Sequence, residues 1–122
     1  MVTGTLVAES LRTGAEIDAV PLRLTRIRRG GVGSAAGGQP QVWTVLDFEA
    51  DDAAAEPLAA ALSAALDPES PWYVDFATAA ERFVVFAGKV FRYPRSDAQG
   101  RAAAVAHALA IGVPEEQTDW PD

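Results

Sequence analysis

Few side chains in this 122-residue chain are suited to covalent or acid–base chemistry. His107 is the only histidine, and cysteine is absent. A histidine can act as a general base near neutral pH, but a Ser-His-acid triad also needs a serine on a sharp, strained turn. The chain has five serines, and none lies in a G-x-S-x-G motif: Ser10, Ser34, Ser63, Ser70 and Ser96. We predict no catalytic residue and expect His107 to be a solvent-exposed side chain.

Residues 31–36 match the G-x-G-x-x-A form of a dinucleotide-binding fingerprint. That motif works where a helix begins directly after it, because the helix N-terminus holds the pyrophosphate. Here a Gly-Gly-Gln-Pro segment and a β-rich run follow instead. The segment therefore indicates a flexible hairpin loop, and we predict no nucleotide cofactor.

A short acidic run offers oxygen atoms that could bind a hard cation such as Ca²⁺ or Mg²⁺. It consists of Asp47, Glu49, Asp51 and Asp52. The run lacks the central glycine and the closing glutamate of an EF-hand loop. We expect ordinary structural roles for these carboxylates and predict no metal site.

Four arginines within seven residues form the most basic segment of the chain: Arg23, Arg26, Arg28 and Arg29. Together with Trp43 they could form a cationic and aromatic patch for single-stranded nucleic acid. The net charge of −7 opposes this, and charges on an edge strand also serve to block aggregation. Nucleic acid is therefore not the partner that we predict.

Composition indicates one globular domain spanning residues 1–122, and the order of its predicted elements places it in the α+β class. Hydrophobic residues make up 49% of the chain and charged residues 22%. The lack of cysteine fits a reducing compartment, and no stretch approaches the ~20 apolar residues of a membrane span. We therefore expect a cytoplasmic protein that does not bind membranes.

Hydrophobic periodicity predicts three strands and a helix, followed by three more strands and a helix. The strands are expected at 2–12, 20–29, 41–49, 72–77, 82–87 and 89–93, and the first helix at 54–66. The second helix should begin at residues 96–99, with Ser96 as its N-cap, and end at Gly112. We predict a mainly antiparallel sheet with both helices packed on one face, the second through Ala98, Ala102, Val105 and Leu109.

The second and third strands are expected to form a hairpin. If Gln41 lies opposite Arg29, apolar residues face one another and Arg23 falls opposite Asp47.

Turn lengths in segment 72–93 sort its side chains onto two faces. Phe76 is expected opposite Phe83, and Phe86 opposite Phe91. One face then holds Trp72, Val74, Phe76, Phe83, Val85 and Val90, and we expect the helices to cover it. The other holds Tyr73, Asp75, Arg82, Val84, Phe86, Phe91 and Tyr93, with a cross-strand contact of Asp75 to Arg82 or to a tyrosine.

Nothing in the sequence clearly covers this second face, and an uncovered aromatic surface is typical of an interface or a ligand groove. We therefore predict a non-enzymatic protein-interaction module, binding another protein or a second copy of itself. Its binding residues would be Tyr73, Asp75, Arg82, Phe86, Phe91 and Tyr93. Two alternatives remain open: a small-molecule binder or enzyme with a pocket at Tyr73, Asp75 and Arg82, or a second core layer formed by packing against the first three strands.

Three segments of the sequence resemble a family of small, uncharacterised proteins of high-GC bacteria. They are WYVDF at 72–76, FVVFAGKVFRYPR at 83–95 and VPEEQTDWP at 113–121. The resemblance implies no activity, and it transfers no catalytic or binding residue to this chain.

Overall fold

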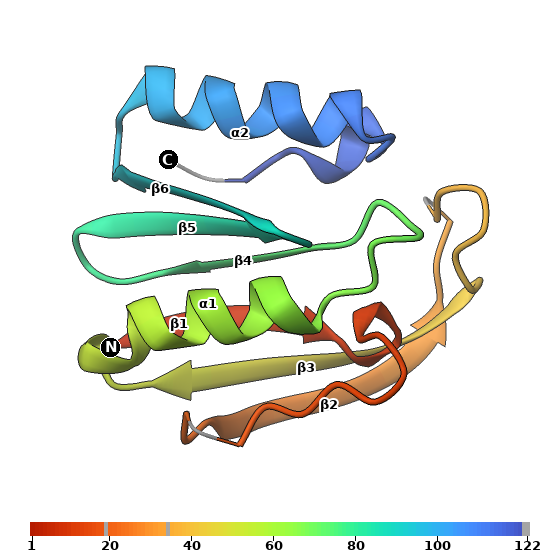
Figure 1. Ribbon diagram of the computed structural model, residues 1–122, viewed down its shortest axis with the longest axis horizontal. Helices are drawn as coiled ribbons and strands as arrows, with labels where there is room; N and C mark the ends of the chain where they lie inside the picture. Colours follow the sequence, from red (N-terminus) through yellow and green to blue (C-terminus); the bar gives the residue numbers. More distant parts are fainter. Residues whose placement is uncertain (19, 34, 121–122) are drawn as a thin grey trace.

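A computed structural model describes residues 1–18, 20–33 and 35–120, and it contains the predicted strands and helices in the predicted order (Figure 1). The elements are β1 (Val2–Val7), β2 (Arg23–Gly31), β3 (Val42–Ala50), α1 (Ala55–Ala65), β4 (Tyr73–Ala77), β5 (Glu81–Phe86), β6 (Lys89–Pro94) and α2 (Ala98–Ala110). Short 3-10 turns lie at Ala8–Ser10, Asp52–Ala54 and Glu115–Gln117. The α+β class and the antiparallel sheet are confirmed.

The six strands form one sheet in the order β2-β3-β1-β4-β5-β6. Each neighbouring pair is antiparallel, so β3 and β4, which flank β1, run parallel to each other and are joined across β1 by α1. Gly4 in β1 allows this packing, because a Cβ there would lie 2.6 Å from Phe76 Cβ and 2.7 Å from Phe48 Cζ. The first strand of the chain is therefore an interior strand of the sheet, between β3 and β4.

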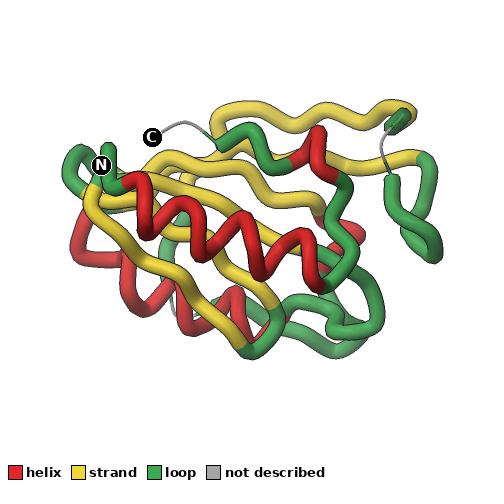
Figure 2. Tube along the Cα trace, turned by 90° about the horizontal axis from the view of Figure 1, so that it is seen from above, coloured by secondary structure: helices red, strands yellow, loops and turns green. Residues whose placement is uncertain are grey.

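The two helices lie on opposite faces of the sheet, so the prediction that both pack on one face is not met. Alternate residues of β5 divide between two hydrophobic clusters: Phe83 and Val85 pack with α1, whereas Val84 and Phe86 pack with α2. Figure 2 shows a strand of the sheet passing between the two helices. Each helix therefore closes a separate core layer.

The buried face of α2 explains why its position was not predicted. Ala104 and Ala108 are fully buried, while Leu109, expected in the apolar stripe, is 45% exposed. Gly100 lies on the same face, where a Cβ would come within 2.4 Å of Tyr93 Cβ. Small residues bring the helix close to the sheet, and a hydropathy pattern that favours large apolar residues does not detect such a face.

The N-cap of α2 is Asp97, and Ser96 is not the cap that the sequence predicted. One carboxylate oxygen of Asp97 accepts hydrogen bonds from the backbone N–H groups of Gln99 (3.1 Å) and Gly100 (3.2 Å). Ser96 instead turns the chain into the helix with a φ of 70°.

The β4-β5-β6 meander sorts its side chains as predicted. Phe76 pairs with Phe83, but Phe86 pairs with Lys89 and Phe91 with Val84, because the turn is formed by Ala87 and Gly88. This register is two residues from the predicted one. An even shift keeps every side chain on its face, so both predicted faces are correct.

The β2–β3 hairpin is also confirmed, but its register is not. Arg29 pairs with Thr44 rather than Gln41, and the ladder shifts between Leu24 and Arg26. Arg23 consequently contacts Glu49, with 2.6 Å between Nη1 and Oε1, and not Asp47. All nine residues of β2 are exposed, so no buried side selects the register from the sequence alone.

Candidate functional site

The face of the sheet opposite α1 is covered over only part of its width. Helix α2 and residues 113–120 pack on β5 and β6, where they bury Val84, Phe86 and Tyr93. Trp120 packs against this layer, with its ring centroid 5.4 Å from that of Tyr73. No described helix packs on the same face of β2, β3 and β1. We call this uncovered part the open face.

The six predicted binding residues divide between the covered layer and its border. Phe86, Tyr93 and Arg82 are only 1%, 3% and 6% exposed. Phe91 is half-buried against Phe86 and His107. Tyr73 and Asp75 are half-buried where the covered part meets the open face. Much of the predicted surface is thus a second core layer, and α2, rather than strands β1 to β3, covers it.

A hollow of about 490 Å³ lies on the open face next to the β2–β3 connection. Trp43, Trp72 and Tyr73 supply aromatic surface, and Arg28 and Arg29 supply positive charge. The remaining lining consists of Thr5, Val7, residues 30–33, Val45, Asp75 and Gln117. We call this cavity the aromatic hollow.

Hydrogen bonds and ring packing hold the aromatic walls in place. The indole N–H of Trp43 donates to the carbonyl oxygen of Pro40 (2.9 Å), and its ring lies 5.2 Å from that of Trp72. The Tyr73 hydroxyl donates to the Gln117 carbonyl oxygen (2.9 Å). Burial, together with the nearby charge of Asp75, raises the pKa of Tyr73 to about 12, so the phenol stays neutral at physiological pH.

Asp75 lies at the border of the hollow and is paired with Arg82. Its Oδ2 atom is 3.1 Å from Arg82 Nη1, which confirms the predicted cross-strand contact. Burial raises the pKa of Asp75, and the positive charge of Arg82 partly opposes that rise. The Arg82 side chain is 7% exposed and that of Asp75 is 28% exposed, so the carboxylate is the member of the pair that solvent and ligands reach.

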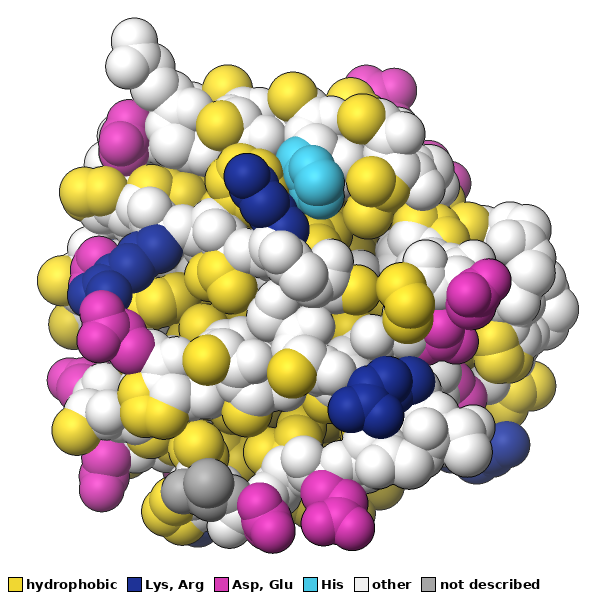
Figure 3. Space-filling model, in the orientation of Figure 1, with side chains coloured by type: hydrophobic (Ala, Val, Ile, Leu, Met, Phe, Trp, Pro, Cys, Tyr) yellow, Lys and Arg dark blue, Asp and Glu magenta, His cyan; other side chains and the backbone are white. Residues whose placement is uncertain are grey.

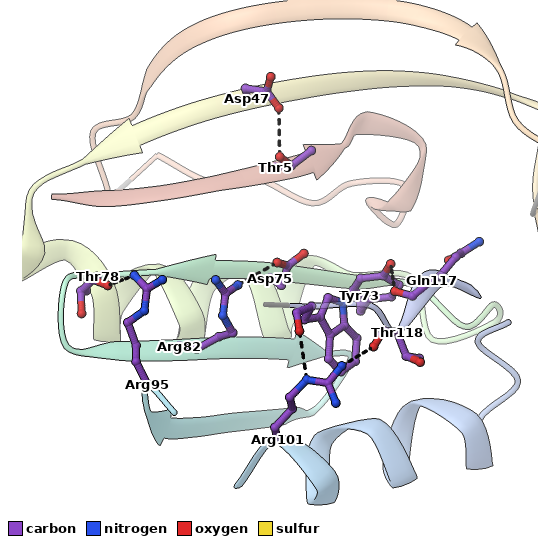
Figure 4. A network of polar contacts seen from close by, with 11 residues as sticks. Thr5, Asp47, Tyr73, Asp75, Thr78, Arg82, Arg95, Arg101, Gln117 and Thr118 are labelled. Atoms are coloured by element: carbon purple, nitrogen blue, oxygen red, sulfur yellow. Dashed lines mark hydrogen bonds and ion pairs between the residues drawn. The ribbon is translucent and has the colours of Figure 1, made fainter. Parts of the chain in front are cut away.

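A second, more polar hollow of about 490 Å³ continues along the open face. It shares Thr5 and Asp75 with the aromatic hollow and extends to Glu49, Arg82 and Arg95. Within it the Thr5 hydroxyl donates to Asp47 Oδ1 (2.9 Å), as Figure 4 shows beside the Asp75–Arg82 pair. The two hollows together form a groove across β1 and its neighbours.

The arginines of β2 differ in whether an anion neutralises them. Arg23 pairs with Glu49, and Arg29 pairs with Glu9 at 3.1 Å. Arg26 and Arg28 form no ion pair within the part of the chain that the structure describes. Arg28 is therefore the cation at the aromatic hollow that remains available to an anion.

The weaker candidates from the sequence have ordinary structural settings. Residues 32–41 connect β2 to β3, so the glycine fingerprint is followed by a strand; its Ser34 lies outside the described residues. Asp47 and Glu49 accept hydrogen bonds from Thr5 and Arg23. His107 is half-buried with its ring 4.6 Å from that of Phe86, so it is less exposed than the solvent-exposed histidine that the sequence predicted.

The sequence grouped Arg28 with Trp43 and, separately, Tyr73 with Asp75, but it did not bring these pairs together. They meet because β1 pairs with both β3 and β4. No local sequence pattern predicts that β1 lies between β3 and β4. Gln117 and the backbone of residues 30–33 were missed for the same reason, since they reach the hollow only through tertiary packing.

Comparison with protein-family models, curated proteins and solved structures finds no match to this chain. Neither described helix has the length and apolar character needed to cross a membrane.

Proposed function

We propose that the protein is a small-molecule-binding module, and that its ligand is a planar ring compound carrying an anionic group. The observation that carries this proposal is the aromatic hollow, where Trp43, Trp72 and Tyr73 lie beside the unpaired Arg28. Ligand sites are commonly apolar hollows of about 300–1,000 Å³ with a few polar groups.

Each part of the lining supports one feature of this ligand. Aromatic side chains favour a flat ring, because rings attract one another in offset and edge-on contacts. A guanidinium favours a carboxylate, phosphate or sulfonate, to which it can donate two parallel hydrogen bonds. Asp75, whose side chain is 28% exposed, provides an acceptor for a ligand N–H or O–H group.

The protein-interaction hypothesis for the β4-β5-β6 face receives less support from the geometry. An interface anchor must be reachable by its partner, whereas Phe86 and Tyr93 lie beneath α2 and residues 113–120. Tyr73 and Asp75 remain accessible, and they belong to the lining that the small-molecule proposal uses.

Paired fluorescent probes test the proposal. The anionic 1-anilinonaphthalene-8-sulfonate and the neutral N-phenyl-1-naphthylamine have similar ring systems, so their difference reports the charge. We expect Arg28→Gln to weaken binding of the anionic probe roughly tenfold and that of the neutral probe by much less, since a charge-assisted hydrogen bond contributes about 1.5–3 kcal/mol.

Arg26→Gln is the matched control, because Arg26 is on the same strand and is likewise unpaired but does not line the aromatic hollow. Equal losses in the two variants, or no binding of either probe to the wild type, would overturn the proposal.

A further inference from the structure

We propose a second binding site, on the outer edge of β2, that accepts an extended acidic segment of a partner protein as an added strand. The C-terminal part of β2, from Arg28 to Gly31, also lines the aromatic hollow, but the proposed site uses the free backbone edge of the strand and is argued without the small-molecule proposal. Strand addition uses the free backbone groups of an edge for affinity and alternate side chains for specificity.

The geometry of β2 provides a long, accessible edge. Within the described chain, β2 pairs with β3 along one side and with no strand along the other, and it forms the bottom edge of the sheet in Figure 1. All nine of its residues are exposed, and none is a proline. The opposite edge strand, β6, has six residues and ends in Pro94, and both helices contact it.

The two faces of β2 define the side chains that an added strand would meet. Leu24 and Ile27 pair with Phe48 and Leu46 on the α1 side, and they are 48% and 62% exposed. Arg26 and Arg28 pair with Asp47 and Val45 on the open face. A complementary strand therefore alternates apolar and acidic residues, since successive side chains point to opposite faces.

The positive charge of β2 favours an acidic partner strand over a second copy of this chain. The segment Arg23–Gly31 contains four of the ten basic residues and no acidic one, although the whole chain carries a net charge of −7. On the α1 face shown in Figure 3, acidic side chains are more prominent than basic ones. Antiparallel pairing of β2 with another β2 brings arginine opposite arginine, which is destabilising, whereas an acidic strand is attracted.

Edge charges that serve only to block aggregation would act differently. Charges with that role alone prevent pairing with any strand. That role does not explain why Leu24 and Ile27 are exposed on the other face of β2. A site for an acidic strand instead predicts binding that depends on both the charge and the backbone of the added segment.

Synthetic eight-residue peptides that alternate glutamate and valine, labelled with a fluorophore, test this inference by fluorescence anisotropy with the full chain. We expect the Glu-Val peptide to bind and a Lys-Val peptide to bind at least tenfold more weakly. Arg26→Glu should weaken the Glu-Val peptide roughly tenfold, and Lys89→Glu, which reverses a charge on the other edge strand, should leave it unchanged.

N-methylation of alternate peptide residues separates strand addition from charge attraction alone. Only one set of N–H groups in an added strand points toward β2, so methylation of that set should abolish binding and methylation of the other set should spare it. Absence of Glu-Val binding, equal binding of the two peptides, equal effects of the two N-methylated forms, or an unchanged affinity in a folded Arg26→Glu variant would each overturn the proposal.

Discussion

At the scale of single residues, Gly100 determines how closely α2 approaches the sheet. Tyr93, which is 3% exposed, occupies the space that a Cβ of residue 100 would need. Alanine normally stabilises a helix interior by about 1 kcal/mol relative to glycine. Here alanine is expected to be destabilising instead, because its Cβ would meet Cβ and Cγ of the buried Tyr93 side chain.

We therefore predict that Gly100→Ala lowers the free energy of unfolding by about 1–3 kcal/mol, as expected for overpacking. Chemical denaturation measures this directly. Gly37→Ala is the control, since no atom lies within 4 Å of a Cβ placed there, and its effect should stay within about 0.5 kcal/mol. A Gly100→Ala protein as stable as the wild type would mean that the helix sits farther from Tyr93.

Asp75 links the border of the aromatic hollow to the pH dependence of stability. Burial raises its folded-state pKa above the ordinary value of 3.8, so the folded protein binds this proton more tightly than the unfolded chain does. Its contribution to stability is therefore fully present below the unfolded-state pKa and is lost as the pH rises through the raised pKa.

We predict that the stability of the wild type relative to Asp75→Asn decreases as the pH rises through this window, because asparagine does not titrate. Urea unfolding of both proteins at several pH values provides the measurement. A constant difference would show that Arg82 cancels the effect of burial on the Asp75 pKa, and a difference that grows with pH would show that Arg82 outweighs burial; either result contradicts the prediction.

At the scale of elements, residues 113–120 act with α2 as the cover of the second core layer. The guanidinium of Arg101 in α2 donates to the backbone carbonyl oxygens of Trp120 (2.9 Å) and Thr118 (3.0 Å). The Trp120 ring packs on Tyr73 and is 4% exposed. The segment thus links the helix to the strand that borders the hollow.

We expect Trp120→Ala to lower the free energy of unfolding by about 3–5 kcal/mol, the usual cost of removing a buried tryptophan. Leu109→Ala, on the exposed side of α2, should cost about 0.5 kcal/mol or less. Thermal and denaturant unfolding of both variants measure these two losses of stability. Similar costs would show that the C-terminal segment contributes little to this layer.

The elements also show which predictions a sequence can support. Period-two patterns and a short turn assign the meander to two faces correctly even though its β5–β6 register is two residues off. Strand β2 carries no such information, because both of its faces meet solvent. The buried stripe of α2 was missed because it consists of glycine and alanine. These small residues let the helix lie close to the sheet, but they give only a weak hydrophobic pattern.

At the scale of the whole molecule, dividing the helices between the two faces creates the candidate site. With both helices on one face, the other face would be open from β2 to β6. Because α2 and residues 113–120 cover much of β5 and β6, most of the groove lies over β2, β3, β1 and the border strand β4, and it reaches β5 at Arg82. The sequence identified Tyr73 and Asp75 but could not supply the pairing of β1 that brings them near Arg28 and Trp43.

Mapping of a bound probe by NMR shows directly whether a ligand binds on the open face. In a titration of the ¹⁵N-labelled protein with 1-anilinonaphthalene-8-sulfonate, we predict the largest shifts at the Trp43 indole N–H, at residues 30–33 and at Tyr73. The smaller hollow near His107 and Ile111 offers an internal comparison. Shifts concentrated at His107 and Ile111, with those around Trp43 unchanged, would contradict a ligand site on the open face.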